Sequence, residues 1–251
     1  MEAPVVVLRV AARYQRGVVG SVDLHTIQIT ADNVEQVLQA LINDVEDIEA
    51  AEARLKLDIR GMVKLLGQFQ HNDDLYHNGE TVLEHMRWVL SDLDKLSDGK
   101  DAATRQLLSI AALLHDVGKA YSYEFKSTKP GEPAKHTFHG HALKSVAVAE
   151  VLLAKHRAAL GDAYQQILDL VRLHDSFLNL AATRSTQGGG VKYLDNFLRE
   201  AIYTGKRLDL LITLAKADSN RSKAEAGSLQ RIEAVLADIA KAEQIRAEAE
   251  A

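Results

Sequence analysis

Several apolar segments of the chain each carry a histidine or an aspartate at or near the end. His115 and Asp116 directly follow the run LLSIAALL, while His174 and Asp218 follow ILDLVRL and LDLLITLAKA. An unpaired carboxylate is costly to bury among such residues, and a bound cation removes that cost. Imidazole nitrogen and carboxylate oxygen together suit Mn, Fe, Co, Ni or Zn. We therefore expect a metal site that includes the adjacent pair His115-Asp116.

A further segment, VLEHMRWVL, places His85 beside an apolar face. Taken singly, each of these residues has an ordinary explanation: a core histidine satisfied by a backbone carbonyl, or an aspartate that caps a helix or opens a turn. Helix bundles build metal sites from side chains that several helices direct inward. The repetition of one pattern on several helices favours such a shared site, although spacing alone leaves both explanations open.

The elements that must position these side chains are helices. From residue 61 onward apolar residues recur at helical spacing, and the whole chain contains only three prolines. Two segments with clustered Pro or Gly, 121–139 and 181–190, are expected to be loops. The predicted helices span residues 60–69, 79–96, 101–115, 140–158, 162–175, 190–202, 205–217 and 228–249.

The first 60 residues follow a different pattern. Val and Ile are frequent in 4–10 and 18–29 and predict a short β-hairpin, whereas 32–58 carries one apolar stripe and predicts a single long amphipathic helix. We therefore expect a mainly α protein with three parts: a small N-terminal αβ appendage (1–60), a helical domain (61–225) and a C-terminal amphipathic helix (226–251). The two outer parts are candidates for a homo-oligomer contact.

Composition and charge exclude several classes of protein. Hydrophobic residues make up 47% of the chain, an ordinary globular fraction, and the formal net charge of −5 lacks the basic excess of a nucleic-acid-binding protein. The absence of cysteine excludes disulfides, zinc knuckles and iron–sulfur clusters. No apolar stretch reaches the length of about 18 residues that a membrane span needs, and the N-terminus lacks a signal-peptide pattern. We expect a cytoplasmic protein that does not span a membrane.

The ordered set His85, His115-Asp116 and Asp218 resembles the H…HD…D signature of the HD superfamily of metal-dependent phosphohydrolases. The segments HNGETVLEHMRWVL, AALLHDVGK and LITLAKADSNRS resemble those that carry the signature, and the resemblance covers residues 70–222. FHGHALKSVAVAEVLL and ILDLVRLHDSF resemble helices of the HD domains attached to bacterial tRNA nucleotidyltransferases, although this chain lacks the nucleotidyltransferase domain. The resemblance implies an HD-domain helical bundle.

The resemblance also implies the ligands of one or two divalent ions: a first ion held by His85, His115, Asp116 and Asp218, and a second held by His141, His174 and a bridging Asp116. His139 competes with His141, and we favour His141 because its GH-x-x-x-S context is the one that resembles the family. The ligand types do not decide among Mn, Fe, Co, Ni, Mg and Zn.

Further residues are candidates for contact with the reacting phosphate. Asp116 and Lys119 are the expected catalytic residues, because Lys119 follows His115 by one helical turn and its ammonium group can hold a phosphate oxygen. The alternative for Lys119 is an ordinary solvated lysine at a helix end. The candidates for substrate binding are Lys119, His139, Lys144, Ser145 and Arg172.

The leading hypothesis is a metal-dependent phosphohydrolase that cleaves a phosphomonoester or phosphodiester, a nucleotide-like small molecule, through a metal-activated water. Two alternatives remain. A minority of HD-fold proteins that have all six ligands are mixed-valent di-iron oxygenases, and the ligand count does not exclude that class. The other alternative is a non-enzymatic sensor or scaffold domain that keeps the metal site. The acidic balance of the chain disfavours long nucleic acid as the sole partner.

Overall fold

The computed structural model describes residues 22–183 and 207–221, together with the single positions 237, 244 and 248, and it describes side chains only to residue 175 in the first of these ranges. Four sequence predictions therefore lie wholly or largely outside the described residues. They are the strand at 4–10, the loop at 181–190, the helix at 190–202 and the C-terminal helix at 228–249.

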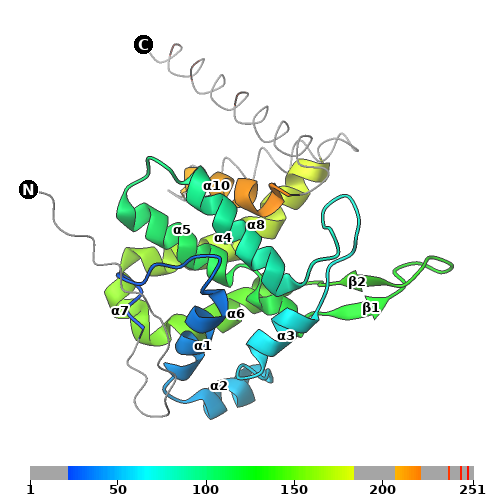
Figure 1. The fold of residues 1–251 in the computed structure, drawn as a ribbon, viewed down its shortest axis with the longest axis horizontal. Helices are drawn as coiled ribbons and strands as arrows, with labels where there is room; N and C mark the ends of the chain where they lie inside the picture. The colour runs from blue at the N-terminus through cyan, green and yellow to red at the C-terminus, as the bar shows by residue number, and fades with distance from the viewer. Residues whose placement is uncertain (1–21, 184–206, 222–236, 238–243, 245–247, 249–251) are drawn as a thin grey trace, which may run out of the picture.

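The centre of the fold is a group of packed helices (Figure 1). α4 (Val82–Leu96) and α5 (Ala102–Leu114) pack on each other, and both contact α10 (Leu208–Ser219). α6 (His141–Leu153) and α8 (Asp162–Thr183) pack together, and α8 also packs on α5 and α10. The mainly helical fold expected from the sequence is confirmed. Each of the predicted helices that lies in the described residues from 61 onward has a counterpart.

Local capping explains where α4 and α5, the helices that position His85 and His115-Asp116, begin. Thr81 and Glu84 form a capping box at the start of α4: the Thr81 hydroxyl accepts from the backbone N–H of Glu84 at 3.2 Å, and the Glu84 carboxylate accepts from the backbone N–H of Thr81 at 2.8 Å. Asp101 caps α5 by accepting from the backbone N–H of Thr104 at 3.0 Å. These caps hold the first turns of the helices that carry His85 and His115.

The prediction of one helix over 32–58 is wrong, because the chain forms α1 (Val34–Asn43) and α2 (Ile48–Leu55) with a break between them. At the break, the Asp44 carboxylate accepts from the backbone N–H of Val22 at 2.8 Å, and Asp47 caps α2 by accepting from Ala50 at 2.9 Å. Both aspartate side chains thus accept hydrogen bonds from backbone N–H groups, and this bonding favours a break over one continuous helix.

The second strand of the predicted N-terminal hairpin is also wrong for residues 22–29, which form a turn at Leu24–Thr26. The Asp23 carboxylate accepts from the backbone N–H of His25, which favours this turn over a strand. Leu24, Ile29 and the buried face of α1 belong to the same hydrophobic core as the central helices. α3 (Met62–Gln68) follows and packs on α4. The described residues of this region, from 22 onward, therefore share the hydrophobic core of the central helices.

Short elements join the helices around the site. A 3₁₀ helix, η1 (Val117–Tyr121), follows the HD pair and packs closely on α6. The predicted helix at 140–158 is divided into α6, the 3₁₀ helix η2 (Ala154–His156) and α7 (Arg157–Leu160). Within the predicted loop at 121–139, β1 (Glu124–Lys126) and β2 (Lys135–Thr137) pair as an antiparallel hairpin that projects from the helices in Figure 1. The loop prediction is wrong for these six residues. Each strand has three residues, too few to show the alternation of apolar and polar residues that predicts a strand.

Gly118 permits the close packing of η1 on α6, and its replacement by alanine is expected to destabilise the protein. A Cβ at this position would lie 2.2 Å from the carbonyl oxygen of His141 and 2.3 Å from the backbone nitrogen of Ser145. Overpacking against backbone costs about 1–3 kcal/mol, which urea denaturation would measure. Gly67→Ala is the matched control, because its Cβ would make only an ordinary 3.7 Å contact with Leu83. That variant should be neutral or more stable, and equal losses in the two variants would contradict the explanation.

None of the helices in the described part of the chain has the length and apolar composition that crossing a membrane requires.

Candidate metal centre

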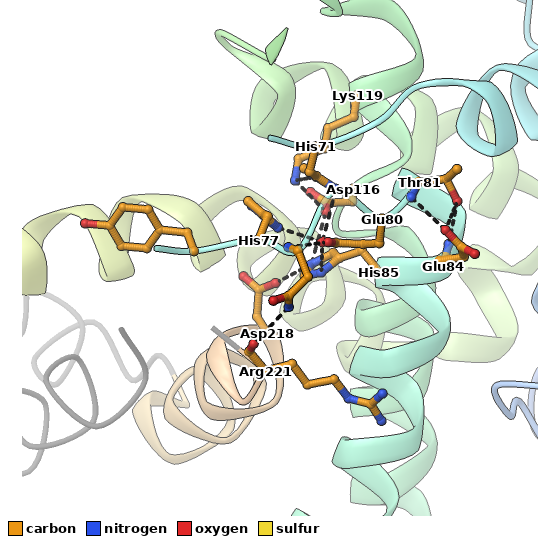
Figure 2. Close-up of polar contacts among 12 residues, drawn as sticks. His71, His77, Glu80, Thr81, Glu84, His85, Asp116, Lys119, Asp218 and Arg221 are labelled. Atoms are coloured by element: carbon orange, nitrogen blue, oxygen red, sulfur yellow. Dashed lines mark hydrogen bonds and ion pairs between the residues drawn. The ribbon is translucent and has the colours of Figure 1, made fainter. Parts of the chain in front are cut away.

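Five elements bring six side chains to one buried place, and we call this group the six-residue centre. His85 comes from α4, the HD pair from the end of α5, and the others from the start of α6, from α8 and from the end of α10. The members are His85, His115, Asp116, His141, His174 and Asp218. Figure 2 shows His85, Asp116 and Asp218 pointing toward one another. These are the six metal ligands expected from the sequence, and the structure brings all of them together.

One oxygen of Asp116 faces the first part of this centre. Asp116 Oδ2 lies 3.3 Å from His115 Nε2 and 3.6 Å from His85 Nε2. Asp218 Oδ1 completes the group, 2.7 Å from His85 Nε2 and 3.6 Å from His115 Nε2. An ion bonded at about 2.1 Å to each ligand atom holds those atoms roughly 3–3.4 Å apart. These four distances are close to the spacing of ligands to a single ion.

The other oxygen of Asp116 faces the second part. Asp116 Oδ1 lies 3.3 Å from His141 Nε2 and 3.6 Å from His174 Nε2, and the two imidazole nitrogens are 3.3 Å apart. These three atoms also have ligand spacing. Asp116 thus stands between two groups of donors with one oxygen toward each, which is the arrangement of a bridging carboxylate. His139, the competing candidate two residues from His141, has an exposed side chain.

Backbone carbonyls orient three of the imidazoles in the same way. The Nδ1 atoms of His115, His141 and His174 lie 2.7, 3.0 and 2.7 Å from the carbonyl oxygens of the residues three positions earlier. A carbonyl only accepts, so each Nδ1 carries a proton and Nε2 is the atom that each ring can offer to an ion. His85 is the exception, because its Nδ1 faces Glu80 Oε1 at 3.7 Å instead.

The polar atoms at the heart of the centre lack hydrogen-bond partners among the described residues. Asp116 Oδ1 and His115 Nε2 are buried without one, and Asp116 Oδ2 has only ion-pair contacts, the shortest of them with Lys119 Nζ at 2.8 Å. Buried polar atoms are nearly always paired, so a group of orphaned ligand atoms points to a bound ion. The donor set of imidazoles and carboxylates fits a borderline or hard divalent cation. The residues present therefore fit the metal that the sequence predicts.

Electrostatics favour a cation at the same place. Burial raises the pKa values of Asp116 and Asp218, but the neighbouring His115 and, for Asp116, Lys119 hold both well below their usual range. Burial alone would lower the pKa of His115, but its interactions with the two aspartates raise it to about 10. Without a metal, a proton on His115 thus supplies positive charge to two ionised carboxylates, and an ion would take its place.

Lys119 lies at the centre rather than in solvent. Its side chain is almost fully buried, and its Nζ lies 2.8 Å from Asp116 Oδ2 and 2.9 Å from His71 Nε2. The same ammonium sits 5.3 Å from the centre of the Phe138 ring. The alternative of a solvated lysine at a helix end is therefore wrong.

The other candidates for substrate contact are placed differently. Ser145 is fully buried, and its hydroxyl accepts from the backbone N–H of Gly118 at 2.8 Å, so it serves packing. Lys144 donates to the carbonyl of Tyr121, and Arg172 is exposed and pairs with Asp169 at 3.1 Å. His139 is exposed. Of the five residues predicted to bind substrate, the described contacts join only Lys119 to the six-residue centre.

Sequence analysis missed a neighbouring cluster made of His71, His77 and Glu80. Glu80 Oε1 lies 2.8 Å from His77 Nδ1 and 3.4 Å from His71 Nδ1, beside His85 (Figure 2). Burial raises the pKa of Glu80, but the bonds from His77 and from the Asn78 backbone outweigh it and lower the pKa to about 2. The close succession of His71, His77 and His85 in the sequence was the available signal.

The family model for the HD domain matches residues 82–242, which is more than half of the chain. This match covers the six-residue centre and Lys119, and it begins just after the cluster of His71, His77 and Glu80. No curated protein matches the chain, and no solved structure matches it. The likeness to the HD domains of tRNA nucleotidyltransferases stays a prediction. The geometry of the centre and the matched residues lead to one conclusion: the chain belongs to the HD domain family.

Proposed function

We propose that the protein is a metal-dependent phosphohydrolase that cleaves a phosphomonoester or phosphodiester of a nucleotide-like small molecule. The observation that supports this most is the position of Asp116, with Oδ2 toward one group of ligand atoms and Oδ1 toward another. HD domains generally bind divalent metals and include metal-dependent phosphohydrolases. Two ions held about 4 Å apart form a clamp suited to displacement at phosphorus.

When bound, divalent ions would lower the pKa of a water molecule and offset the negative charge of a phosphate ester. The residues of the chain have the remaining tasks. Asp116 and its five partners fix the positions of the ions, and the backbone carbonyls that accept from Nδ1 of three histidines keep those imidazoles aligned. Lys119 holds a positive charge next to Asp116, where it can bind a phosphate oxygen or stabilise the charge that develops during cleavage.

A direct test is metal analysis of protein purified without chelator, paired with a panel of phosphomonoesters and phosphodiesters assayed with Mn, Mg, Co, Ni and Fe. Metal-dependent release of phosphate or of a phosphomonoester is the expected result. The same six ligands would also suit a di-iron oxygenase, so iron-dependent oxygen consumption without any turnover of phosphate esters would overturn the proposal in favour of that class. A fully metal-loaded protein that is inert in both assays would favour a sensor or scaffold.

Replacement of Lys119 by glutamine is expected to lower kcat about 10²-fold, because it removes a buried positive charge beside the reacting groups. The measurement is steady-state kinetics on the best substrate of the panel. Lys64→Gln on α3 is the matched control, since Lys64 is exposed and belongs to neither the centre nor the cluster of His71, His77 and Glu80. Unchanged kcat in the Lys119 variant would remove that residue from the catalytic group.

A further inference from the structure

We propose that His71, His77 and Glu80 form a separate metal site for a borderline transition ion such as Zn²⁺ or Co²⁺, next to the six-residue centre and distinct from it. The proposal does not depend on which reaction the six-residue centre catalyses. None of its three residues belongs to that centre, and all three precede the residues that the HD family model matches. Two imidazoles and one carboxylate are a ligand set that proteins use for zinc.

Backbone pairing brings the three residues together, although nine positions separate the first from the last. Gln70 pairs with Thr81 and Asp73 with Asn78 in antiparallel bridges, so the segment folds back on itself. The backbone N–H of His71 donates to the carbonyl of Glu80 at 2.9 Å. This fold-back is anchored to β2, because the side-chain amide of Asn72 makes two 2.9 Å hydrogen bonds with the backbone of His136. The site thus rests on a fixed backbone.

The Glu80 carboxylate is preorganised as a ligand. Its side chain is buried, and its Oε2 accepts from the backbone N–H of Asn78 at 2.7 Å. The other oxygen, Oε1, is left to face His77 Nδ1 at 2.8 Å and His71 Nδ1 at 3.4 Å. An ion bonded at about 2.1 Å to each atom would hold them at nearly these separations.

His71 supplies an independent indication of a missing ligand. Its side chain is buried, and its Nδ1 has no hydrogen-bond partner among the described residues although it points to Glu80. Its other ring nitrogen, Nε2, lies 2.9 Å from Lys119 Nζ, so Nδ1 is the nitrogen that faces Glu80. An orphaned imidazole nitrogen beside an ionised carboxylate is the pattern that also marks the six-residue centre.

His77 is the residue of this site that is in contact with solvent. Its side chain is 25% exposed, whereas those of His71 and Glu80 are almost fully buried. The His71 and His77 rings are stacked, with centroids 3.9 Å apart and planes within 8°. The partly exposed His77 ring is the one with room to turn about its own bond and direct its lone pair at the ion. Water from the exposed side would fill the remaining coordination positions.

Occupation of this site would alter Lys119. Lys119 donates to His71 Nε2, so His71 carries its proton on Nδ1 when no ion is bound. Binding an ion through Nδ1 moves that proton to Nε2, which can then no longer accept from the ammonium group. Of its two polar contacts, Lys119 would keep the one with Asp116. The site is therefore placed to adjust a catalytic side chain according to the supply of metal.

The test is a count of bound ions in the full-length protein. Wild type, His77→Gln and Asp116→Ala are stripped of metal, dialysed against Zn²⁺ or Co²⁺, and analysed by mass spectrometry. His77 contributes no atom to the six-residue centre, and its partial exposure makes the variant tolerable to the fold. His25→Gln is the control for loss of an exposed histidine. We expect one equivalent fewer in His77→Gln than in wild type and His25→Gln, and one equivalent retained in Asp116→Ala.

Cobalt spectra give a second readout that needs no substrate. The visible absorption of Co²⁺ in Asp116→Ala should disappear when His77→Gln is added. Equal ion counts in wild type and His77→Gln, or unchanged spectra in the double variant, would overturn the proposal and leave Glu80 as a hydrogen-bonding support for His85. Absence of phosphate-ester turnover would instead refute the proposed function and leave these counts unaffected.

Discussion

Asp116→Ala is expected to lose the ions of the six-residue centre and to lower kcat/KM by about 10³-fold or more. Asp116 is the only member of the centre whose two oxygens face both groups of ligand atoms, so its loss removes a donor from each possible ion. Metal ions supply several kcal/mol of transition-state stabilisation, and each 1.36 kcal/mol corresponds to a factor of ten in rate. Metal analysis and steady-state kinetics on the same preparation would measure both effects.

The control for Asp116→Ala must remove a buried carboxylate elsewhere. Asp44→Asn does so, because Asp44 is buried and contacts Val22, Lys155 and His156. That variant is expected to lose stability but to keep its metal. Circular dichroism would show that both variants are folded. Full metal content in folded Asp116→Ala would disprove the assignment of the six-residue centre. Loss of the ions of that centre, with retention of the ion proposed for His71, His77 and Glu80, would support it.

The helices that carry the centre were predictable because their signals are local. An apolar stripe and a capping residue lie within each of α4 and α5, and both helices begin within a few residues of the expected positions. The break between α1 and α2 was not predictable in this way. Both pieces keep their apolar residues at helical spacing, and the interruption at Asp44 depends on a hydrogen bond with Val22, which is distant in the sequence.

The ligands of the centre were predictable for a related reason. His115, Asp116 and Asp218 follow apolar helical runs, where their residue types are out of place, whereas His141 was expected only from the resemblance to the family, and His174 lies within α8. Glu80 and His71 lie instead in a segment without regular structure, where polar residues are ordinary. Only the bridges that pair Gln70 with Thr81 and Asp73 with Asn78 bring them together, and such pairing leaves no periodic pattern in the sequence. Similarly, Ser145 looked available to substrate until its contact with Gly118 was known.

His141→Gln is expected to reduce the number of bound ions by one relative to wild type and to lower kcat about 10²–10³-fold, as the loss of one half of a two-ion clamp would. His141 Nε2 faces Asp116 Oδ1 and His174 Nε2. None of the described contacts of this nitrogen involves His85, His115 or Asp218, which belong to the first group of ligands. The first ion should therefore stay. Metal analysis at a fixed free-metal concentration measures the difference.

His139→Gln is the matched control, because it removes an imidazole two residues away on the same junction but from an exposed position. The pair of variants separates three arrangements of the centre. Loss of one equivalent only in His141→Gln supports the bridging role of Asp116, whereas loss only in His139→Gln would require the chain before α6 to rearrange when metal binds. Equal ion counts in wild type and both variants would mean that Asp116 Oδ1 serves no second ion. In that case hydrolysis would depend on a single ion, and Lys119 would be the remaining positive charge beside Asp116.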